Sequence, residues 1–134
     1  MTKSITATVF MVLESEYERS TVRTRLRYRT DRPFEMTARF HRPGECAKSW
    51  VFARDLLLDG RGSFAGQGDL RIWPLRFARH SRVFFSLASD DGDCLLSADA
   101  DDVDAWCAEM ETLVPRGAEE RHFDIDAQLA RFLG

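Results

Sequence analysis

The sequence has few of the residues on which disulfide-linked and zinc-binding proteins depend. Its three cysteines are Cys46, Cys94 and Cys107, which lie in hydrophobic contexts without C-x-x-C spacing. An odd number of scattered cysteines is typical of reduced cytosolic thiols. The three histidines lie in separate segments, and none has a second histidine or a cysteine three or four residues away. We therefore expect neither a structural disulfide nor a zinc site.

Long apolar runs are also missing. No stretch approaches the ~20 apolar residues of a membrane span, and residues 1–12 lack the basic start, apolar run and cleavage site of a signal peptide. We expect a cytoplasmic protein. With 134 residues, 44% hydrophobic and 31% charged, the composition is that of an ordinary globular protein. The length predicts one domain, spanning residues 1–134.

Motifs for catalysis and cofactor binding are missing as well. There is no G-x-S-x-G nucleophile motif and no P-loop. Residues 60–65 match G-x-G-x-x-G/A, but a helix is expected before them and a strand after them, the reverse of a dinucleotide site. Residues 122–126, His-Phe-Asp-Ile-Asp, offer possible cation ligands but are more simply explained as helix capping. We expect no enzyme activity, no cofactor and no metal.

Charge is divided unevenly along the chain. The net charge is −3, but residues 1–82 hold 16 Lys and Arg against 9 Asp and Glu, a net of +7. Residues 83–134 hold 3 against 13, a net of −10. This asymmetry favours electrostatic recognition of a partner or head-to-tail association of copies, although solvated faces alone could produce it.

The first half of the chain predicts a β-meander. Residues 5–13 are a β-branched and apolar run, and in residues 22–29 every second residue is an arginine. Because side chains alternate along a strand, residues 22–29 would have one half-buried face and one guanidinium face. Residues 34–41 and 49–53 predict two more strands, and residues 54–59 a short helix that ends at a glycine.

The second half predicts three strands and two helices after a glycine-rich loop. We expect strands at residues 69–73, ended by a proline, and at 83–88 and 94–98, joined by a tight Asp-Gly turn. Residues 99–114 carry an apolar stripe with helical period, and residues 125–133 predict a last short helix. The fold class is α+β: a seven-stranded antiparallel sheet or partly open barrel with C-terminal helices.

The arginines of the second strand and their neighbours form a predicted basic patch. Its members are Arg23, Arg25, Arg27, Arg29, Arg39 and Arg42, with Arg32 beside them. Like charges on one strand face repel each other unless an anion compensates them. The compensating group is either an acid of the protein, from Glu14, Glu16, Glu18 or the acidic helix, or an external ligand. The sequence leaves both possibilities open.

Two segments resemble a known family. Residues 50–57, Trp-Val-Phe-Ala-Arg-Asp-Leu-Leu, and residues 68–74, Gly-Asp-Leu-Arg-Ile-Trp-Pro, are similar to the signature of the SsgA-like proteins of sporulating actinobacteria. The resemblance covers nearly the whole chain, and residues 114–126 are most similar to the SsgB branch.

The resemblance implies a function that composition and spacing do not. It implies a non-enzymatic, sporulation-specific factor that helps to place or recruit the tubulin-like division protein FtsZ at the septum. The implied partners are FtsZ, other division proteins including membrane-associated ones, and SsgA-like paralogues. The family fold is similar to that of the trimeric whirly-type proteins, so the resemblance also implies a whirly-like fold and a homotrimer.

A protein-binding surface is predicted on the short helix and the loop after it. A short helix with three leucines is not expected to hide all of them in its own core. We therefore expect contact with the division machinery through Arg54, Leu56, Leu57, Leu58 and Phe64. The alternative is that Leu56 and Leu57 simply belong to the core.

A single-stranded nucleic-acid-binding protein of whirly-like fold is the alternative function. The arginine face would then follow the phosphates, and Tyr28, Phe34 or Phe64 would stack on bases. The acidic second half of the chain argues against this function, because it repels phosphates. Under the leading hypothesis no nucleic-acid partner is expected.

Overall fold

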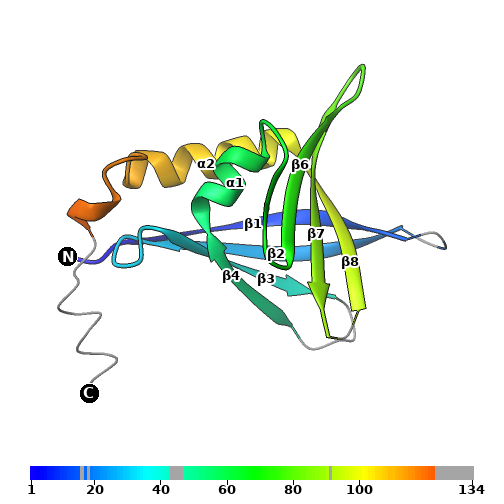
Figure 1. Ribbon diagram of the computed structural model, residues 1–134, viewed down its shortest axis with the longest axis horizontal. Coiled ribbons are helices and arrows are strands. Elements are labelled where there is room, and N and C mark those ends of the chain that lie inside the picture. The colour runs from blue at the N-terminus through cyan, green and yellow to red at the C-terminus, as the bar shows by residue number, and fades with distance from the viewer. Residues whose placement is uncertain (16, 18, 43–46, 91, 123–134) are drawn as a thin grey trace.

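The computed structural model describes residues 1–15, 17, 19–42, 47–90 and 92–122 (Figure 1). These residues form an eight-stranded antiparallel sheet, two α-helices and a 3₁₀ helix. The strands are β1 (Ser4–Glu14), β2 (Arg19–Arg29), β3 (Glu35–His41), β4 (Lys48–Ala53), β5 (Ala65–Gln67), β6 (Leu70–Arg76), β7 (Ser81–Ser89) and β8 (Gly92–Asp99). The helices are α1 (Arg54–Gly60), α2 (Ala100–Leu113) and the 3₁₀ helix η1 (Glu119–Arg121).

The sheet consists of two meanders joined at their first and last strands. Its order is β4-β3-β2-β1-β8-β7-β6-β5, so the meander β1–β4 meets the meander β5–β8 where β1 pairs with β8. Each meander is followed directly by a helix, α1 after β4 and α2 after β8. The sheet curls into a half-barrel with both helices on its concave side (Figure 1). The sheet therefore has a covered inner face and an open outer face.

The predicted α+β class and antiparallel sheet are confirmed, but the strand count of seven is wrong. The additional strand, β5, comes from the glycine-rich loop and pairs with only residues 70–72. Three residues are too few to show a period in the sequence. The end predicted at Pro74 is also wrong, because β6 continues to Arg76 and pairs Pro74 with Val83. Beyond the short β5, β6 is an edge strand, which is where sheets tolerate proline.

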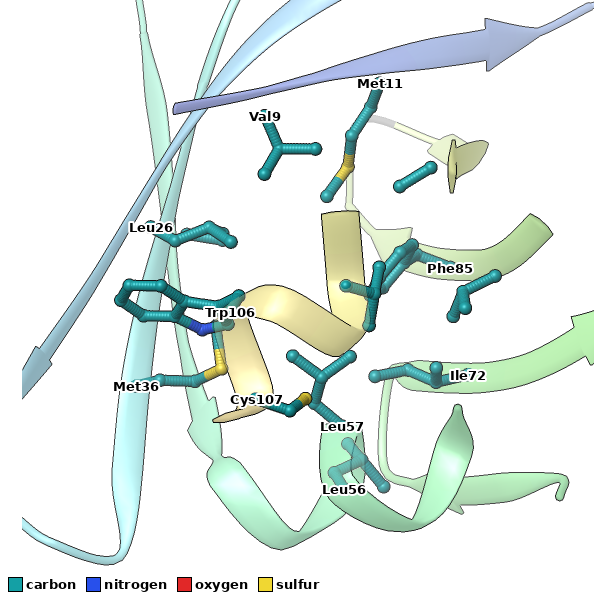
Figure 2. Close-up of a cluster of buried hydrophobic side chains, with 14 of the residues drawn as sticks. Val9, Met11, Leu26, Met36, Leu56, Leu57, Ile72, Phe85, Trp106 and Cys107 are labelled. Atoms are coloured by element: carbon teal, nitrogen blue, oxygen red, sulfur yellow. The ribbon is translucent and has the colours of Figure 1, made fainter. Parts of the chain in front are cut away.

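The concave face holds the core. Trp106, Cys107 and Met110 of α2 are at most 1% exposed and pack against the strands, with Leu57 of α1 beside them (Figure 2). The apolar stripe predicted for this helix is confirmed. Asp99 caps α2 by accepting a hydrogen bond of 2.8 Å from the backbone N–H of Asp101. The short helix predicted at residues 125–133 lies outside the described residues.

The alternation predicted for the second strand is confirmed. On β2, Val22, Thr24, Leu26 and Tyr28 point to the concave side and are buried, and Arg23, Arg25 and Arg27 are exposed on the outer face. Pairing with β1 and β3 aligns these arginines with the outward residues of the neighbouring strands. The arginine face is therefore on the side of the sheet away from α2.

Substitution of Gly60 tests how closely α1 packs on β6. A Cβ at Gly60 would lie 2.5 Å from Cγ2 and 2.6 Å from Cβ of Ile72, which is fully buried. We expect Gly60→Ala to lower the free energy of unfolding by about 1–3 kcal/mol, as overpacking typically does. Gly62→Ala is the control, because its nearest atom would be the Asp59 carbonyl oxygen at 3.8 Å, and a change below about 0.5 kcal/mol is expected. Urea denaturation measures both, and equal stabilities would contradict the packing.

Candidate functional site

Arg54 positions the segment predicted to bind partners. It is the first residue of α1 and is fully buried. Its Nη1 donates to the carbonyl oxygens of Val114 (2.8 Å) and Met110 (3.4 Å), at the C-terminal end of α2. The Met110 carbonyl already accepts from the backbone N–H of Val114 at 2.9 Å, so the guanidinium chiefly satisfies the Val114 carbonyl. A cation at this end of α2 also interacts favourably with the helix dipole. Arg54 therefore joins the start of α1 to the end of α2.

Glu119 supplies the counter-charge. Its Oε1 accepts a hydrogen bond of 2.8 Å from Nη2 of Arg54, and its Oε2 accepts one of 2.8 Å from the backbone N–H of Gly117. Burial alone would raise the pKa of Glu119, but these hydrogen bonds outweigh burial and the pKa is lowered. Glu119 is therefore ionised at neutral pH and holds η1 against α1.

Tyr28 completes the surroundings of the guanidinium. The Arg54 guanidinium lies 5.2 Å from the centre of the Tyr28 ring, within range for a cation–π contact. The Tyr28 hydroxyl donates to the Pro33 carbonyl oxygen at 2.8 Å, and burial raises the pKa of Tyr28 to about 12. Tyr28 therefore stays neutral and faces the core. Its predicted role as a stacking platform for bases is wrong, because it is only 1% exposed.

The leucines of α1 are core residues. Leu56, Leu57 and Leu58 are 8%, 2% and 6% exposed, so the expectation that a short helix could not hide all three is wrong. Five of the seven residues of α1 are buried, and Leu56 and Leu57 point into the cluster of core side chains (Figure 2). Of the five residues predicted to contact partners, Phe64 alone has a largely exposed side chain, at 63%.

Phe64 belongs to a row of aromatic rings on the outer face. It stacks on Trp73 of β6 at a centroid distance of 6.1 Å, and Trp73 stacks on Phe84 of β7 at 6.0 Å. Trp73 and Phe84 are directly opposite each other in the β6–β7 pairing, between positions whose side chains point into the core. Sequence reasoning missed this row, because it considered Phe64 by itself and did not predict which residues of the two neighbouring strands lie opposite each other. The available signal was the alternation along β6, which points Trp73 outward because its neighbour Ile72 points into the core.

A polar ladder lies beside the aromatic row. Nε of Arg82 donates to Oγ of Ser97 at 3.0 Å, and this hydroxyl donates to Oε1 of Glu14 at 3.0 Å. The same Glu14 oxygen accepts from Arg19 at 3.0 Å. Burial tends to raise the pKa of Glu14, but the hydrogen bonds from Arg19 and Ser97 lower it overall. Glu14 is thus engaged with Arg19 and Ser97, not with the arginine face.

The structure divides the predicted basic patch into parts. Arg29 is paired with Asp31 through two hydrogen bonds of 2.7 and 2.9 Å. Arg42 lies at another place, the open end of the half-barrel. Arg23, Arg25 and Arg39 surround a shallow hollow on the outer face together with His41 and Thr8. Arg27 is exposed beside them.

The acids predicted to neutralise the basic patch do not pair with its outer-face arginines in the described part of the chain. Glu14 is engaged elsewhere, and the acidic helix α2 lies on the concave side of the sheet, away from the arginine face (Figure 1). Glu16 and Glu18 lie outside the described residues. Within the described part of the chain, no ion pair or hydrogen bond involves the side chains of Arg23, Arg25, Arg27 or Arg39.

A larger hollow of about 750 Å³ opens at the end of the half-barrel where β3 and β4 approach β7 and β8. Apolar side chains form most of its wall, including Leu13, Phe40, Trp50, Leu87 and Leu96. The charged lining residues are Glu14, Arg42, Lys48 and Asp93.

Cys94 also lines this hollow, and burial raises the pKa of its thiol. Burial also raises the pKa of Cys107, to about 11. Neither thiol is in the reactive thiolate form at neutral pH.

Two further features bear on metal and membrane binding. Among the described residues, no three His, Cys, Asp or Glu side chains gather in a cluster that could hold a metal ion. The candidate ligands at residues 123–126 lie outside these residues. Neither α-helix in the described part has the length and apolar character that crossing a bilayer requires.

The chain is similar to known proteins over most of its length. Residues 22–119 match the family model described as Streptomyces sporulation and cell division protein, SsgA. The sporulation-specific cell division protein SsgB of Streptomyces coelicolor is 41% identical over 108 residues, which cover 81% of this chain and 79% of that protein. The resemblance noted in the sequence is confirmed.

Two solved structures share the fold. One, from work on SsgB mutations that correlate with longitudinal cell division during sporulation of S. coelicolor, has a TM-score of 0.85 at 35% identity and covers 92% of this chain and 98% of that one. The SsgA-like sporulation-specific cell division protein of Thermobifida fusca has a TM-score of 0.87 at 32% identity, with 97% and 96% covered. The curled sheet with its two helices is therefore common to these proteins.

Glu119→Gln tests the buried ion pair. The substitution leaves the Arg54 guanidinium buried without its counter-charge, so we expect a loss of about 3 kcal/mol at neutral pH, at the low end for breaking such a pair because an amide oxygen still accepts a hydrogen bond. The exposed neighbour Glu120 provides the control, since Glu120→Gln should change stability by less than about 0.5 kcal/mol.

The same variant predicts a pH dependence. Because the folded pKa of Glu119 is lowered, its stabilisation is complete above the unfolded pKa of about 4.3 and disappears as the pH falls through the folded pKa. The stability difference between wild type and Glu119→Gln should therefore narrow in acid. Denaturation curves across that range measure it, and a difference that widens in acid would contradict the assigned charge state.

Proposed function

Because the chain belongs to the SsgA family of sporulation and cell division proteins, we propose that it is a non-enzymatic factor of sporulation-specific cell division. It recruits FtsZ to septum sites by direct protein–protein contact, together with other division proteins and SsgA-like paralogues. Residues 1–134 act as one SsgA-like domain in the cytoplasm and gather at the septum. The observation that supports contact over catalysis is the aromatic row of Phe64, Trp73 and Phe84, in which Phe64 is exposed and the other two rings are partly buried.

The aromatic row has the properties of an interface centre. Large aromatic side chains dominate the binding energy of many interfaces, particularly where they are held rigidly. Phe64 is 63% exposed at the end of the row, and the helix before it is anchored by Arg54 and three buried leucines. Arg54 and these leucines then support the binding surface from beneath, and Phe64 contacts the partner.

The charge distribution supports assembly of identical copies. The arginines of β2 and β3 that form no ion pair with a described residue lie on the outer face. The exposed acids Asp101 and Asp102 lie at the start of α2, on the other side of the sheet. Surfaces of opposite charge on opposite faces cannot meet within one chain but can meet between copies. Such a head-to-tail contact closes into a ring when the rotation is suitable. We take a whirly-like homotrimer as the assembled form.

Single-strand binding is less well supported than protein binding. The arginines lie on β2 and β3, and Phe64 directly precedes β5, so β1, β8, β7 and β6 separate them in the sheet. Tyr28 is buried, so the described residues do not place it beside the arginines as a stacking surface. Phe10 does place an exposed ring opposite Arg23, but a track for single strands interleaves several such rings with basic side chains.

Phe64→Ala tests the interface. We expect it to weaken FtsZ binding by about 10- to 30-fold, the loss typical of an aromatic hot spot, and to lower the free energy of unfolding by no more than about 1 kcal/mol. Phe77→Ala, at an exposed ring (47%) on the β6–β7 hairpin, is the matched control and should leave affinity unchanged. Titration with purified FtsZ by fluorescence anisotropy gives both affinities. An equal effect of the two substitutions would refute the assigned surface.

Leu58→Glu distinguishes support from contact. Because Leu58 is buried, a carboxylate there should lower the melting temperature strongly and reduce binding only as a consequence of unfolding. A stable Leu58→Glu protein with weak FtsZ binding would instead place Leu58 in the interface.

Tight binding of single-stranded oligonucleotides at physiological salt, with no FtsZ binding even when membrane partners are present, would overturn the proposed function.

A further inference from the structure

The basic hollow on the outer face is compact and strongly cationic. It has a volume of about 250 Å³ and is lined by Thr8 of β1, Arg23 and Arg25 of β2, and Arg39 and His41 of β3. Strand pairing places Arg25 directly opposite Arg39, and Arg23 directly opposite His41. Side chains at such paired positions have Cβ atoms about 4.5–5.5 Å apart, so the four groups converge on one small area.

Six arginines outside the hollow are paired with nearby acids. Arg19, Arg29, Arg32, Arg54, Arg61 and Arg116 all form ion pairs, at 2.7 to 3.4 Å. The three arginines of the hollow have no such pair among the described residues. Two arginines directly opposite each other destabilise a sheet. The arginines of the hollow therefore repel one another, and a bound anion would offset this repulsion.

The neighbouring strands bring no acid to the hollow. On β1 the residues opposite Arg25 and Arg23 are Thr8 and Phe10, and on β4 the residue opposite Arg39 is Ser49. All three are uncharged, and Thr8 and Ser49 have hydroxyl groups that donate to an anion. The described surroundings therefore consist of cations and neutral hydrogen-bond donors.

The geometry points to a binding site for a phosphoryl group, formed by Arg23, Arg25, Arg39 and His41. A hollow of about 250 Å³ is smaller than the pockets of about 300–1,000 Å³ that enclose whole organic ligands, so it suits one or two phosphoryl groups. A carboxylate has two oxygens and one charge, enough for one guanidinium fork, whereas a phosphoryl group has three acceptor oxygens and up to two charges. Three guanidinium groups match the phosphoryl group better.

His41 makes the site sensitive to pH. Partial burial lowers its pKa, and the charges of Arg23, Arg39 and Arg25 lower it further. His41 is therefore mainly neutral at pH 7. A bound dianion favours its protonated form, so anion binding raises the pKa of His41, and acid strengthens binding of an anion whose own charge is constant. This site is independent of FtsZ binding, since the hollow and the aromatic row lie on different strands.

The test uses the full chain and anions of fixed chemistry. Sulfate is the first probe, because it stays a dianion across the pH range in which histidine titrates, and inorganic pyrophosphate is the second. NMR titration at constant ionic strength should show saturable shifts at His41 and at the guanidinium groups of Arg23, Arg25 and Arg39. The pKa of His41 should rise on saturation with sulfate.

A double variant separates site binding from general charge effects. In Arg25→Gln/Arg39→Gln we expect pyrophosphate affinity to fall at least about tenfold, because charge-assisted hydrogen bonds provide most of the affinity of a small anion. The anion-free variant should be at least as stable as wild type, since the repulsion between the two arginines is gone. Arg76→Gln, at an exposed arginine of β6, is the control and should keep wild-type affinity.

Two comparisons identify the source of the phosphoryl group. Sedimentation with phosphatidylcholine vesicles, with and without phosphatidylglycerol, that is inhibited by pyrophosphate would assign a lipid headgroup. Binding of pyrophosphate without vesicle binding would assign a soluble phosphorylated ligand.

Three results would overturn the site. These are the absence of saturable shifts at His41, equal shifts at Arg76 and at the hollow, and pyrophosphate affinity retained in the double variant. An oligonucleotide that binds far more tightly than pyrophosphate and requires Arg27 as well would replace the phosphoryl site with a nucleic-acid track.

Discussion

The buried guanidinium of Arg54 is the contact on which the two halves of the fold depend. It lies where the first meander passes into α1, and it binds the last carbonyls of α2 and the carboxylate of Glu119. Burying a cation is costly unless a counter-charge and hydrogen-bond acceptors offset the loss of water. Here helix carbonyls, a carboxylate and the Tyr28 ring do so. The chain after α2 is thereby tied to the start of α1, and the concave face is closed.

Because the helices close the concave face, the outer face of the sheet is the surface left for binding. The core takes up the leucines of α1 and the apolar stripe of α2, so these residues support the surface without being part of it. The outer face is then divided across the strands into an arginine zone on β2 and β3, a polar ladder from Glu14 to Arg82, and an aromatic row on the β5–β7 side. Separate zones on one rigid sheet allow two different ligands to bind without competition.

Much of this arrangement could be predicted from local patterns. Alternation identified β2 with its arginine face, and helical period identified the buried stripe of α2, because both signals lie within one element. The aromatic row and the Arg54 contacts depend on residues far apart in the sequence, and local patterns do not contain them. The leucines of α1 were misassigned for the same reason, since burial of a short helix depends on what surrounds it. The sequence predicted seven strands and not eight, because the three residues of β5 form a strand only through their pairing with β6.

The central claim is that the outer face at the aromatic row, and not the helices, meets the division machinery. Hydrogen exchange of the full chain with and without purified FtsZ measures this most directly. We expect added FtsZ to slow exchange at residues 64–73 and around Phe84, with α2 unchanged. Protection confined to the exposed side of α2, or to β2 and β3, would contradict the claim.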